Sequence, residues 1–311
     1  MRTDRRDRYE YRTIGQSKGE SLICTLLMAA ITFTFIGLTT YLVTKPDTRK
    51  LNILAPLYLY PTQWNAAAGV NEIHPDWLKL EKSAIDNPDV QQVVVLNPGS
   101  SGDGSLWDPT QSVAPHTHYP LWKKVFDKLD VLKNVKLLGY VPTNYGDASK
   151  VALVKTYIDG YFLNWKVDGI FYDETGNPSG GDSKAVYKEY VDYTETKLKG
   201  AFDVFNFGST VDQNSDEYDD EWLKLAELNI MYENEFSKLD TFEPSQPQKN
   251  LPHSRSALLM HALPKYSDIS LEDAYNKQFG YVYFTTGSGA NPWETLLTDY
   301  DKFVKDVQDF T

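Results

Sequence analysis

The sequence contains a single cysteine, Cys24, among its 311 residues. One cysteine cannot form an intramolecular disulfide, and cysteine-based metal sites need several. A folded region of this chain must therefore be held together by its hydrophobic core. The hydrophobic fraction of 41% and the charged fraction of 24% are ordinary for a globular protein. The length accommodates an α/β barrel of about 250 residues with one additional segment.

Positive charge is scarce as well. The 31 Lys and Arg residues are outnumbered by 43 Asp and Glu residues, which gives a net charge of -12. Nucleic acids are bound through basic surfaces that contact their phosphates, so this composition argues against a nucleic-acid partner. No G-K-S or G-K-T sequence follows a glycine-rich loop, which argues against the alternative of a barrel enzyme acting on phosphorylated metabolites.

Metal ligands are few. The five histidines include one close pair, His116 and His118, but this pair lies in a proline-containing loop without a clear third ligand. We therefore expect neither a metal ion nor any other cofactor. Aromatic residues, by contrast, are plentiful at 14%, with 21 Tyr and 7 Trp. Most such rings pack in a core, but carbohydrate-binding clefts also use them to stack on sugar faces.

The longest hydrophobic run is LICTLLMAAITFTFIGLTTYLV, residues 22–43, which carries no charge. A helix of this length spans the roughly 30 Å hydrocarbon core of a membrane. Basic residues are concentrated before this run, so the positive-inside rule places the N-terminus in the cytoplasm. We predict a cytoplasmic basic tail at 1–20, a transmembrane signal anchor at 21–44, a linker at 45–51 and an extracellular domain at 52–311. The chain would then be a single-pass type II protein of the cell membrane.

Eight apolar runs rich in Val, Ile, Leu, Tyr and Phe recur beyond residue 50. Most of them are continuous rather than alternating, which is typical of a parallel sheet buried on both faces. Segments with helical spacing lie between them, and strands that alternate with helices form βαβ units. We expect strands at 52–60, 91–97, 135–141, 169–173, 202–207, 228–233, 256–261 and 280–285, and helices at 75–85, 120–132, 148–165, 184–198 and 293–310.

Eight such units predict an α/β fold, the (β/α)8 TIM barrel. The fifth to seventh helices are the least regular in the sequence, so a doubly wound open sheet is the alternative. An open sheet of that kind usually has a glycine-rich phosphate loop after its first strand. Residues 58–62 read YLYPT and contain no glycine, which favours the barrel.

Carboxylates follow two of the expected strands. Asp173 and Glu174 end the fourth strand, and Glu233 and Glu235 end the sixth. Because the active site of a TIM barrel lies at the carboxyl ends of its strands, these acids should meet at one mouth. Glycosidic bonds are hydrolysed by two facing carboxyl groups, one as acid and one as nucleophile or base. We predict a glycoside hydrolase with catalytic Asp173, Glu174 and Glu233, although each acid alone could be a helix cap or a surface ion pair.

Other polar and aromatic residues end strands at the same mouth. For this reason we expect them to line the cleft and bind substrate, although His261 could equally be a hydrogen-bonded barrel residue without contact to a ligand. The predicted substrate-binding residues are Tyr58, Asn97, Tyr140, Asn206, Glu235 and His261.

Several segments resemble the spherulin-4-like family, in the right order along residues 52–310. The most specific is VDGIFYDE at 167–174. The others are YLYP at 58–61, NPGS at 97–100, LGYVPT at 138–143, NFGS at 206–209, YE at 232–233, YFT at 283–285 and NPW at 291–293.

The resemblance implies a (β/α)8 barrel and an endo-acting α-1,4-N-acetylgalactosaminidase that cuts galactosaminogalactan, a fungal exopolysaccharide. The essential acids of the family correspond to Asp173, Glu174 and Glu233. The chain departs from the family in having Tyr232 before Glu233 where Phe is usual, in its NPGSSGDG loop, and in a loop at 285–288 without acidic residues. A non-catalytic glycan-binding cell-wall or spore-coat protein is the alternative. A protein of that kind would tend to lose one of the three acids, and all three are present.

The mature N-terminus tests the anchor prediction. Because residues 21–44 should stay in the bilayer, we expect protein recovered from membranes to begin before residue 21. Residues 45–311 expressed alone should be a soluble monomer. Sequencing of the N-terminus and size-exclusion chromatography measure these outcomes. A mature N-terminus near residue 45 would show instead that the segment is a cleaved signal peptide.

Overall fold

The computed structural model describes residues 49–98, 119–176, 183–210, 221–266 and 270–310. The described residues from Lys50 onward form one compact unit. In these described ranges no helix is long and apolar enough to cross a membrane. The segment at 21–44, for which we predicted a transmembrane helix, lies outside them, and the anchor stays a prediction.

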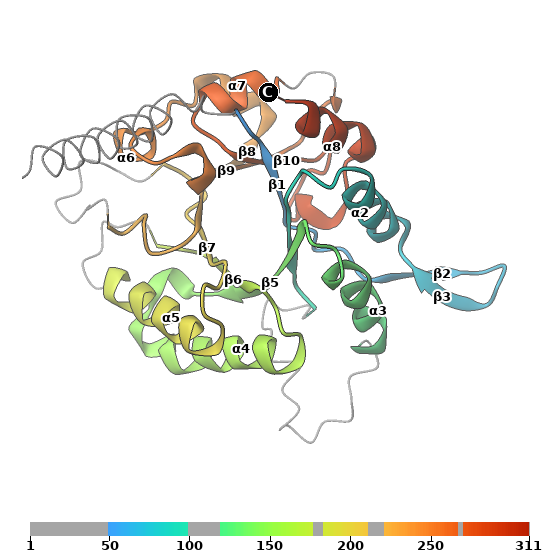
Figure 1. The fold of residues 1–311 in the computed structure, drawn as a ribbon, viewed down its shortest axis with the longest axis horizontal. Coiled ribbons are helices and arrows are strands. Elements are labelled where there is room, and N and C mark those ends of the chain that lie inside the picture. The colour runs from blue at the N-terminus through green and yellow to red at the C-terminus, as the bar shows by residue number, and fades with distance from the viewer. Residues whose placement is uncertain (1–48, 99–118, 177–182, 211–220, 267–269, 311) are drawn as a thin grey trace, which may run out of the picture. The chain divides into compact units, whose positions relative to one another are not determined.

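Eight parallel strands close into a barrel, in the order β1-β10-β9-β8-β7-β6-β5-β4, with β4 pairing back to β1 (Figure 1). This closure confirms the predicted TIM barrel and contradicts the open sheet. Every expected strand is present, although the first, expected over 52–60, ends at Ala55, and the other ends differ by a few residues at most. The strands are β1 Asn52–Ala55, β4 Gln92–Leu96, β5 Val135–Pro142, β6 Gly169–Asp173, β7 Val204–Asn206, β8 Leu228–Glu235, β9 Ser256–His261 and β10 Tyr281–Phe284.

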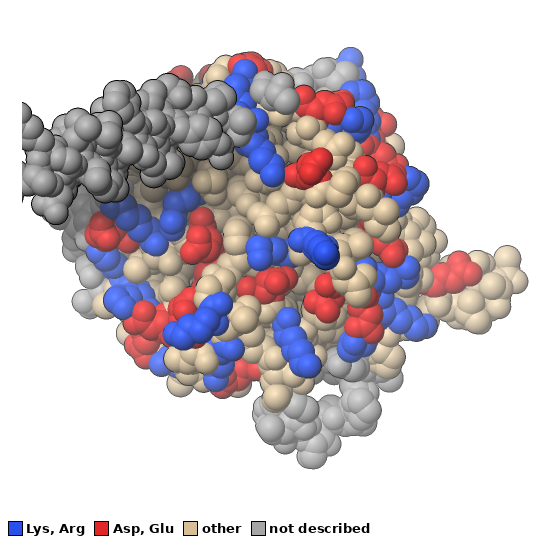
Figure 2. All heavy atoms as spheres, in the orientation of Figure 1, with Lys and Arg blue, Asp and Glu red and all other residues tan. Residues whose placement is uncertain are grey.

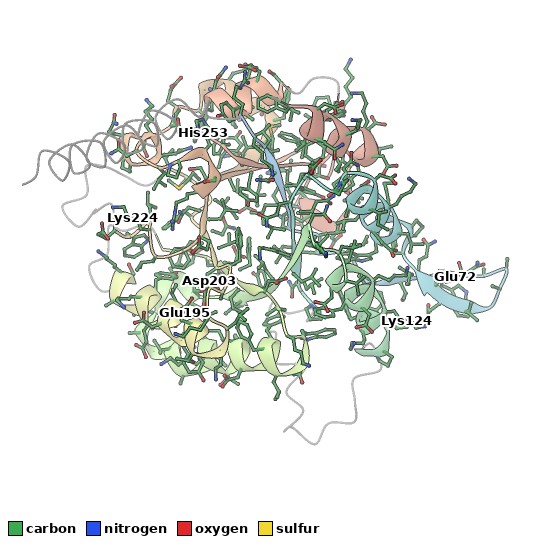
Figure 3. All side chains as sticks on the ribbon, in the orientation of Figure 1. Glu72, Lys124, Glu195, Asp203, Lys224 and His253 are labelled. Atoms are coloured by element: carbon green, nitrogen blue, oxygen red, sulfur yellow. The ribbon has the colours of Figure 1, made fainter. Side chains whose placement is uncertain are left out.

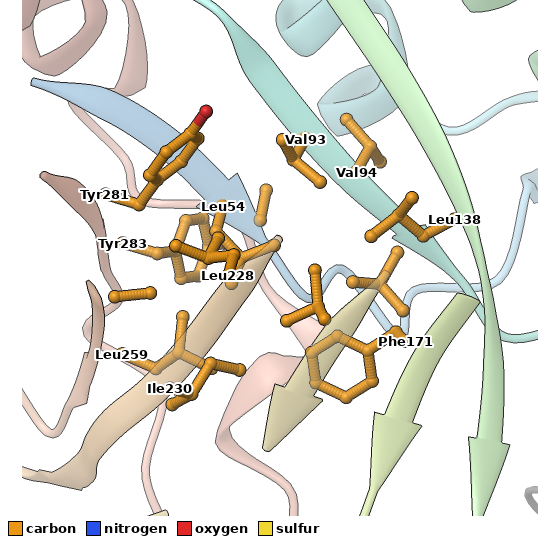
Figure 4. Packing of buried hydrophobic residues seen from close by; sticks show 14 of the residues in the cluster. Leu54, Val93, Val94, Leu138, Phe171, Leu228, Ile230, Leu259, Tyr281 and Tyr283 are labelled. Atoms are coloured by element: carbon orange, nitrogen blue, oxygen red, sulfur yellow. The ribbon is translucent and has the colours of Figure 1, made fainter. Parts of the chain in front are cut away.

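Burial on both faces of the barrel wall explains the continuous apolar runs. The whole of β4, with the sequence QVVVL, is buried. Val93 pairs in register with Leu54 of β1, and both belong to the packed cluster that includes Leu138 of β5 (Figure 4). Branched residues of this kind favour strands, because they pack well on a pleated surface. Gly139 of β5 lets a helix approach closely, since a Cβ atom there would lie 2.3 Å from the Tyr161 ring.

Helices surround the barrel where the sequence predicted them. The main ones are α2 Pro75–Asp86, α3 Tyr119–Asp130, α4 Val151–Asn164, α5 Ser183–Lys197 and α8 Tyr300–Asp309, and α6 Gln246–Lys249 and α7 Leu271–Asn276 are short. On the face drawn in Figure 2, acidic and basic side chains are interspersed. Several ion pairs of the described residues join side chains four residues apart on one helix, such as Lys188 with Asp192.

Two features differ from expectation. An antiparallel hairpin, β2 Thr62–Asn65 and β3 Val70–Ile73, follows β1 and extends from the body (Figure 1). The helix predicted at 293–310 begins only at Tyr300. Pro292 instead starts a single 3-10 turn, η7 Pro292–Glu294, and Thr295 ends this turn with extended backbone angles. Trp293 therefore lies in the loop after β10.

Asp203 is a buried carboxyl at the opposite end of the barrel from the predicted site. Its side chain is 2% exposed and its Oδ1 accepts a hydrogen bond of 3.0 Å from the Ile170 backbone nitrogen. Burial raises the pKa of Asp203 to about 8, and the nearby negative charges of Glu195 and Glu227 act in the same direction. Asp203 and Glu195 are both labelled in Figure 3. Asp203 is therefore a proton-bearing carboxyl group in the folded protein at neutral pH.

Replacement by asparagine should remove the pH dependence that Asp203 confers on stability. Between its ordinary pKa of 3.8 and about 8, the folded state holds one more proton than the unfolded state. The free energy of unfolding should therefore fall as pH rises, by up to about 1.4 kcal/mol per pH unit. In urea unfolding of residues 45–311, Asp203→Asn should flatten this fall. The wild-type fall should persist in Asp168→Asn, which changes another carboxylate that accepts a strand amide, from Leu137. Equal slopes in all three proteins would contradict the assignment.

Candidate active site

One amide joins the two main carboxylates at the carboxyl ends of the strands. Asn206 ends β7, which lies between β6 and β8 in the barrel. Its Nδ2 donates a hydrogen bond of 2.7 Å to Oδ1 of Asp173 and another of 2.7 Å to Oε2 of Glu233. These two carboxylate oxygens can therefore be no farther apart than twice that distance. The structure thus brings together the acids that the sequence placed on the fourth and sixth strands.

The second oxygen of Glu233 is held by a residue that the sequence analysis did not assign to the site. The indole nitrogen of Trp293 donates to Oε1 of Glu233 at 3.0 Å. Trp293 is only 5% exposed, and its carbonyl oxygen accepts a hydrogen bond of 3.0 Å from the Tyr58 backbone nitrogen. Its ring meets His261 edge-on with the centroids 5.7 Å apart. The NPW segment at 291–293, one of those that resemble the family, could have pointed to Trp293 as a site residue. The sequence analysis instead assigned Trp293 to a helix over 293–310.

The second oxygen of Asp173 is also occupied. The Tyr140 hydroxyl donates a hydrogen bond of 2.6 Å to Oδ2. Burial, followed by the negative charge of Asp173, raises the pKa of Tyr140 above its usual value, so the phenol stays protonated and remains a donor. The Tyr140 ring packs edge-on against Tyr58, with the centroids 5.4 Å apart. Asp173 therefore accepts a hydrogen bond on each of its two oxygens.

Glu233 has the environment of a proton donor. Burial raises its pKa above the usual value, and the negative charge of Asp173 raises it further. The hydrogen bonds from Asn206 and Trp293 act in the opposite direction, but burial prevails. Two neighbouring carboxyl groups in different surroundings are the arrangement that separates an acid from a nucleophile in glycosidases.

Glu174 is near this pair but not part of its hydrogen-bond bridge. Its backbone has a φ of 54°, a left-handed conformation that costs a non-glycine residue about 1–3 kcal/mol. Its Oε2 accepts a hydrogen bond of 3.2 Å from the Asn144 backbone nitrogen, in the loop after β5. The turn in the backbone directs Glu174 toward that loop, and its half-buried carboxylate lies at the edge of the site.

The remaining predicted residues lie at strand ends around the pair. Tyr58 is half-buried against Tyr140. Oδ1 of Asn97 and Nδ1 of His261 are buried atoms without a hydrogen-bond partner within the described part of the chain. Burial lowers the pKa of His261, which favours the neutral ring. Glu235 is exposed and its Oε2 accepts a hydrogen bond from Ser237 at 3.2 Å, so it lies on the rim rather than in the bridge.

The described residues contain no group of three or more His, Cys, Asp or Glu side chains arranged to hold a metal ion. What the site does contain is a hydrogen-bonded carboxylate pair with aromatic neighbours. Such a pair can transfer a proton and attack an electrophilic carbon, which is the chemistry of glycosidic bond cleavage.

The chain is similar to known proteins. The family model for the spherulation-specific family 4 matches residues 52–307. The crystal structure of Aspergillus clavatus Sph3 in complex with GalNAc is similar, with 23% identity and a TM-score of 0.63 over 84% of this chain and 98% of that one. The PgaB (BpsB) glycoside hydrolase domain from Bordetella bronchiseptica has 9% identity and a TM-score of 0.49 over 84% of this chain and 98% of that one. No curated protein matches.

The likeness to the Sph3 structure concerns the fold alone, and the family match shows the family to which the chain belongs. The matched residues run from the first barrel strand into the last helix, and they include every acid of the site. The predicted resemblance is thereby confirmed, and the chain belongs to the spherulation-specific family 4.

Proposed function

We propose that this protein is a glycoside hydrolase that cleaves within an α-1,4-linked polysaccharide of N-acetylgalactosamine and galactosamine, of the galactosaminogalactan type. The observation that carries the proposal is the bridge from Asp173 through Asn206 to Glu233. The bridge holds the carboxyl groups of Asp173 and Glu233 close enough together for both to reach the same glycosidic bond, one as acid and the other as nucleophile. Membership of the spherulation-specific family 4 supports the same class of activity.

The spacing favours retention of the anomeric configuration. Carboxyl groups about 5–5.5 Å apart leave no room for a water molecule between sugar and base, whereas inverting pairs lie about 6.5–9.5 Å apart. The bridged oxygens of Asp173 and Glu233 fall in the shorter class, because one nitrogen lies 2.7 Å from each of them.

In the first step, Glu233 gives its proton to the glycosidic oxygen, and the bond between that oxygen and the anomeric carbon breaks with its electron pair going to the oxygen. An oxygen of Asp173 forms a bond to the anomeric carbon. In the second step, Glu233 takes a proton from water, the water oxygen bonds to the anomeric carbon, and Asp173 leaves as a carboxylate. The raised pKa of Glu233 suits the first step, and the hydrogen bonds to Asp173 stabilise its returning charge.

Negative charge favours an amino sugar as the substrate. The acids Asp173, Glu174, Glu233 and Glu235 follow two strand ends, and a partly deacetylated galactosaminan carries ammonium groups that they attract. At about 4 Å such an attraction is worth about 1–4 kcal/mol between the limits of bulk water and a protein surface. A neutral glucan gains nothing from it. The Sph3 structure in complex with GalNAc supports the same class of sugar.

The protein would do this at the cell surface. We propose that residues 21–44 anchor it in the membrane, that residues 52–311 act outside the cell as a monomer, and that polysaccharide is its partner. The alternative is a non-catalytic glycan-binding surface protein. A binding protein does not need a proton-donating glutamate within reach of a second carboxylate, so the bridged pair favours the enzyme.

The release of reducing ends from galactosaminan, chitosan and a neutral glucan tests this function. We expect activity on galactosaminan. Glu233→Gln and Asp173→Asn should each lose at least about 100-fold in rate while folding normally, because each removes a catalytic carboxyl group. Glu235→Gln is the matched control, with the same chemical change on the exposed rim. It should turn over at a measurable rate and bind the charged polymer more weakly.

The pH dependence should follow Glu233. As pH rises through its raised pKa, the proton donor is lost, so the rate should fall on the alkaline side. Equal activity of wild type and Glu233→Gln would refute the catalytic assignment. Activity on the neutral glucan alone would refute the amino-sugar substrate. Binding of galactosaminan without any cleavage by the wild type would favour the non-catalytic alternative.

A further inference from the structure

The turn after β5 has a strained backbone beside the carboxylates. Asn144, Tyr145 and Gly146 all have positive φ angles, of 49°, 57° and 77°. Glycine adopts this left-handed conformation freely, but tyrosine rarely does. Three such residues in succession persist only where the surroundings hold them in place.

Hydrogen bonds fasten this turn to the segment that carries the acids. The Tyr145 backbone nitrogen donates to the Glu174 carbonyl oxygen at 3.0 Å, and the Asn144 backbone nitrogen donates to the Glu174 carboxylate at 3.2 Å. The Thr143 hydroxyl lies 2.7 Å from the Asp173 carbonyl oxygen. The backbone carbonyls of Asp173 and Glu174 and the carboxylate of Glu174 therefore hold the turn in position at the end of β6.

A glycine makes this close approach possible. A Cβ atom at Gly176 would lie 2.7 Å from the Tyr145 carbonyl oxygen, which is closer than real Cβ contacts allow. The Gly176 backbone nitrogen also donates to the Tyr187 hydroxyl at 3.0 Å, and that hydroxyl lies 2.6 Å from the Thr143 hydroxyl. The support beneath the turn is thus buried and closely fitted.

Despite this firm support, the Tyr145 side chain is 69% exposed. Among the described residues, the exposed large aromatic side chains are Tyr60, Trp64 and Tyr145. Trp64 belongs to strand β2 of the hairpin, whereas Tyr60 and Tyr145 lie in the segments that follow β1 and β5, on the side of the barrel where the site lies. Tyr145 is the one that bonds directly to Glu174. The strained turn therefore holds the main chain of an exposed tyrosine against Glu174, whose carboxylate lies outside the bridged pair.

We propose that Tyr145 and Glu174 form a sugar-binding subsite beside the bridged carboxylates, for a second unit of the hexosamine chain. The Tyr145 ring receives the apolar face of the sugar, since an aromatic ring offers a flat apolar surface at little cost in conformational freedom. The Glu174 carboxylate accepts hydrogen bonds from the amino, amide or hydroxyl groups of the same sugar. This inference rests on the proposed function, because it assigns a subsite to that polymer.

Steady-state kinetics on hexosamine polymer test the subsite. Tyr145→Ala removes the ring but keeps a Cβ atom on the same left-handed backbone, so the turn is unchanged. It should raise KM about tenfold, the loss expected for one aromatic contact, and leave kcat within about twofold. Tyr145→Phe should match the wild type, because it keeps the ring. Gly176→Ala should also raise KM, because its Cβ atom would clash with the Tyr145 carbonyl oxygen and displace the turn at 144–146.

Leu163→Ala is the matched control. Leu163 is 63% exposed, but it lies at the end of α4 away from the site, so KM should not change. An unchanged KM in Tyr145→Ala would overturn the subsite while polymer cleavage by the wild type stands. A fall in kcat with an unchanged KM would overturn it too, since Tyr145 would then only position Glu174.

Binding measured without turnover separates this inference from the proposed function. Titration calorimetry measures the affinity for galactosaminan of two proteins, the single variant Glu233→Gln and the double variant Glu233→Gln with Tyr145→Ala. Weaker binding in the double variant supports the subsite even if the wild type cleaves nothing, in which case the proposed cleavage fails. Equal binding of the two proteins would overturn the subsite.

Discussion

The pair of hydrogen bonds from the Asn206 amide to Asp173 and Glu233 is the interaction on which the site depends. Two carboxyl groups this close repel each other when both are ionised, which is why one of them tends to keep a proton. The amide supplies a donor to each group and fixes their spacing. Asn206 itself ends a strand of three residues between β6 and β8, so the spacing is a property of the barrel wall and not of a loop.

The hydrogen bonds to the other two oxygens of Asp173 and Glu233 form only because the barrel closes. Tyr140 reaches Asp173 from β5, and Trp293 reaches Glu233 from the loop after β10. These two elements belong to different regions of the sequence, and they meet because β1 pairs with both β10 and β4. The apolar core supplies the free energy for closure, since no disulfide can. The unequal surroundings of the two carboxyl groups follow from the same packing.

Burial on both faces of the strands made the fold predictable from sequence, because it leaves continuous apolar runs. The positions of Asp173 and Glu233 were predictable because acids at strand ends meet at one mouth. The roles of their neighbours were not. Asn206 stays a predicted substrate-binding residue, but the structure adds that it holds the acids, and Glu174 is turned toward Asn144 by its left-handed backbone. The position of Trp293 in the site depends on a 3-10 turn that ends at Thr295, and the sequence pattern predicted a helix there instead. The β2–β3 hairpin was not predicted because its strands are polar and contain no apolar run.

The most direct test of the account is to identify the residue that becomes bonded to the sugar. A fluorinated, activated N-acetylgalactosaminyl donor slows the breakdown of a covalent intermediate, and peptide fragmentation by mass spectrometry then locates the label. The account predicts a label of one sugar on Asp173, because its Oδ1 lies across the Asn206 bridge from Oε2 of Glu233, and no label in Asp173→Asn. A label on Glu174 or Glu233 would contradict the assignment of the pair.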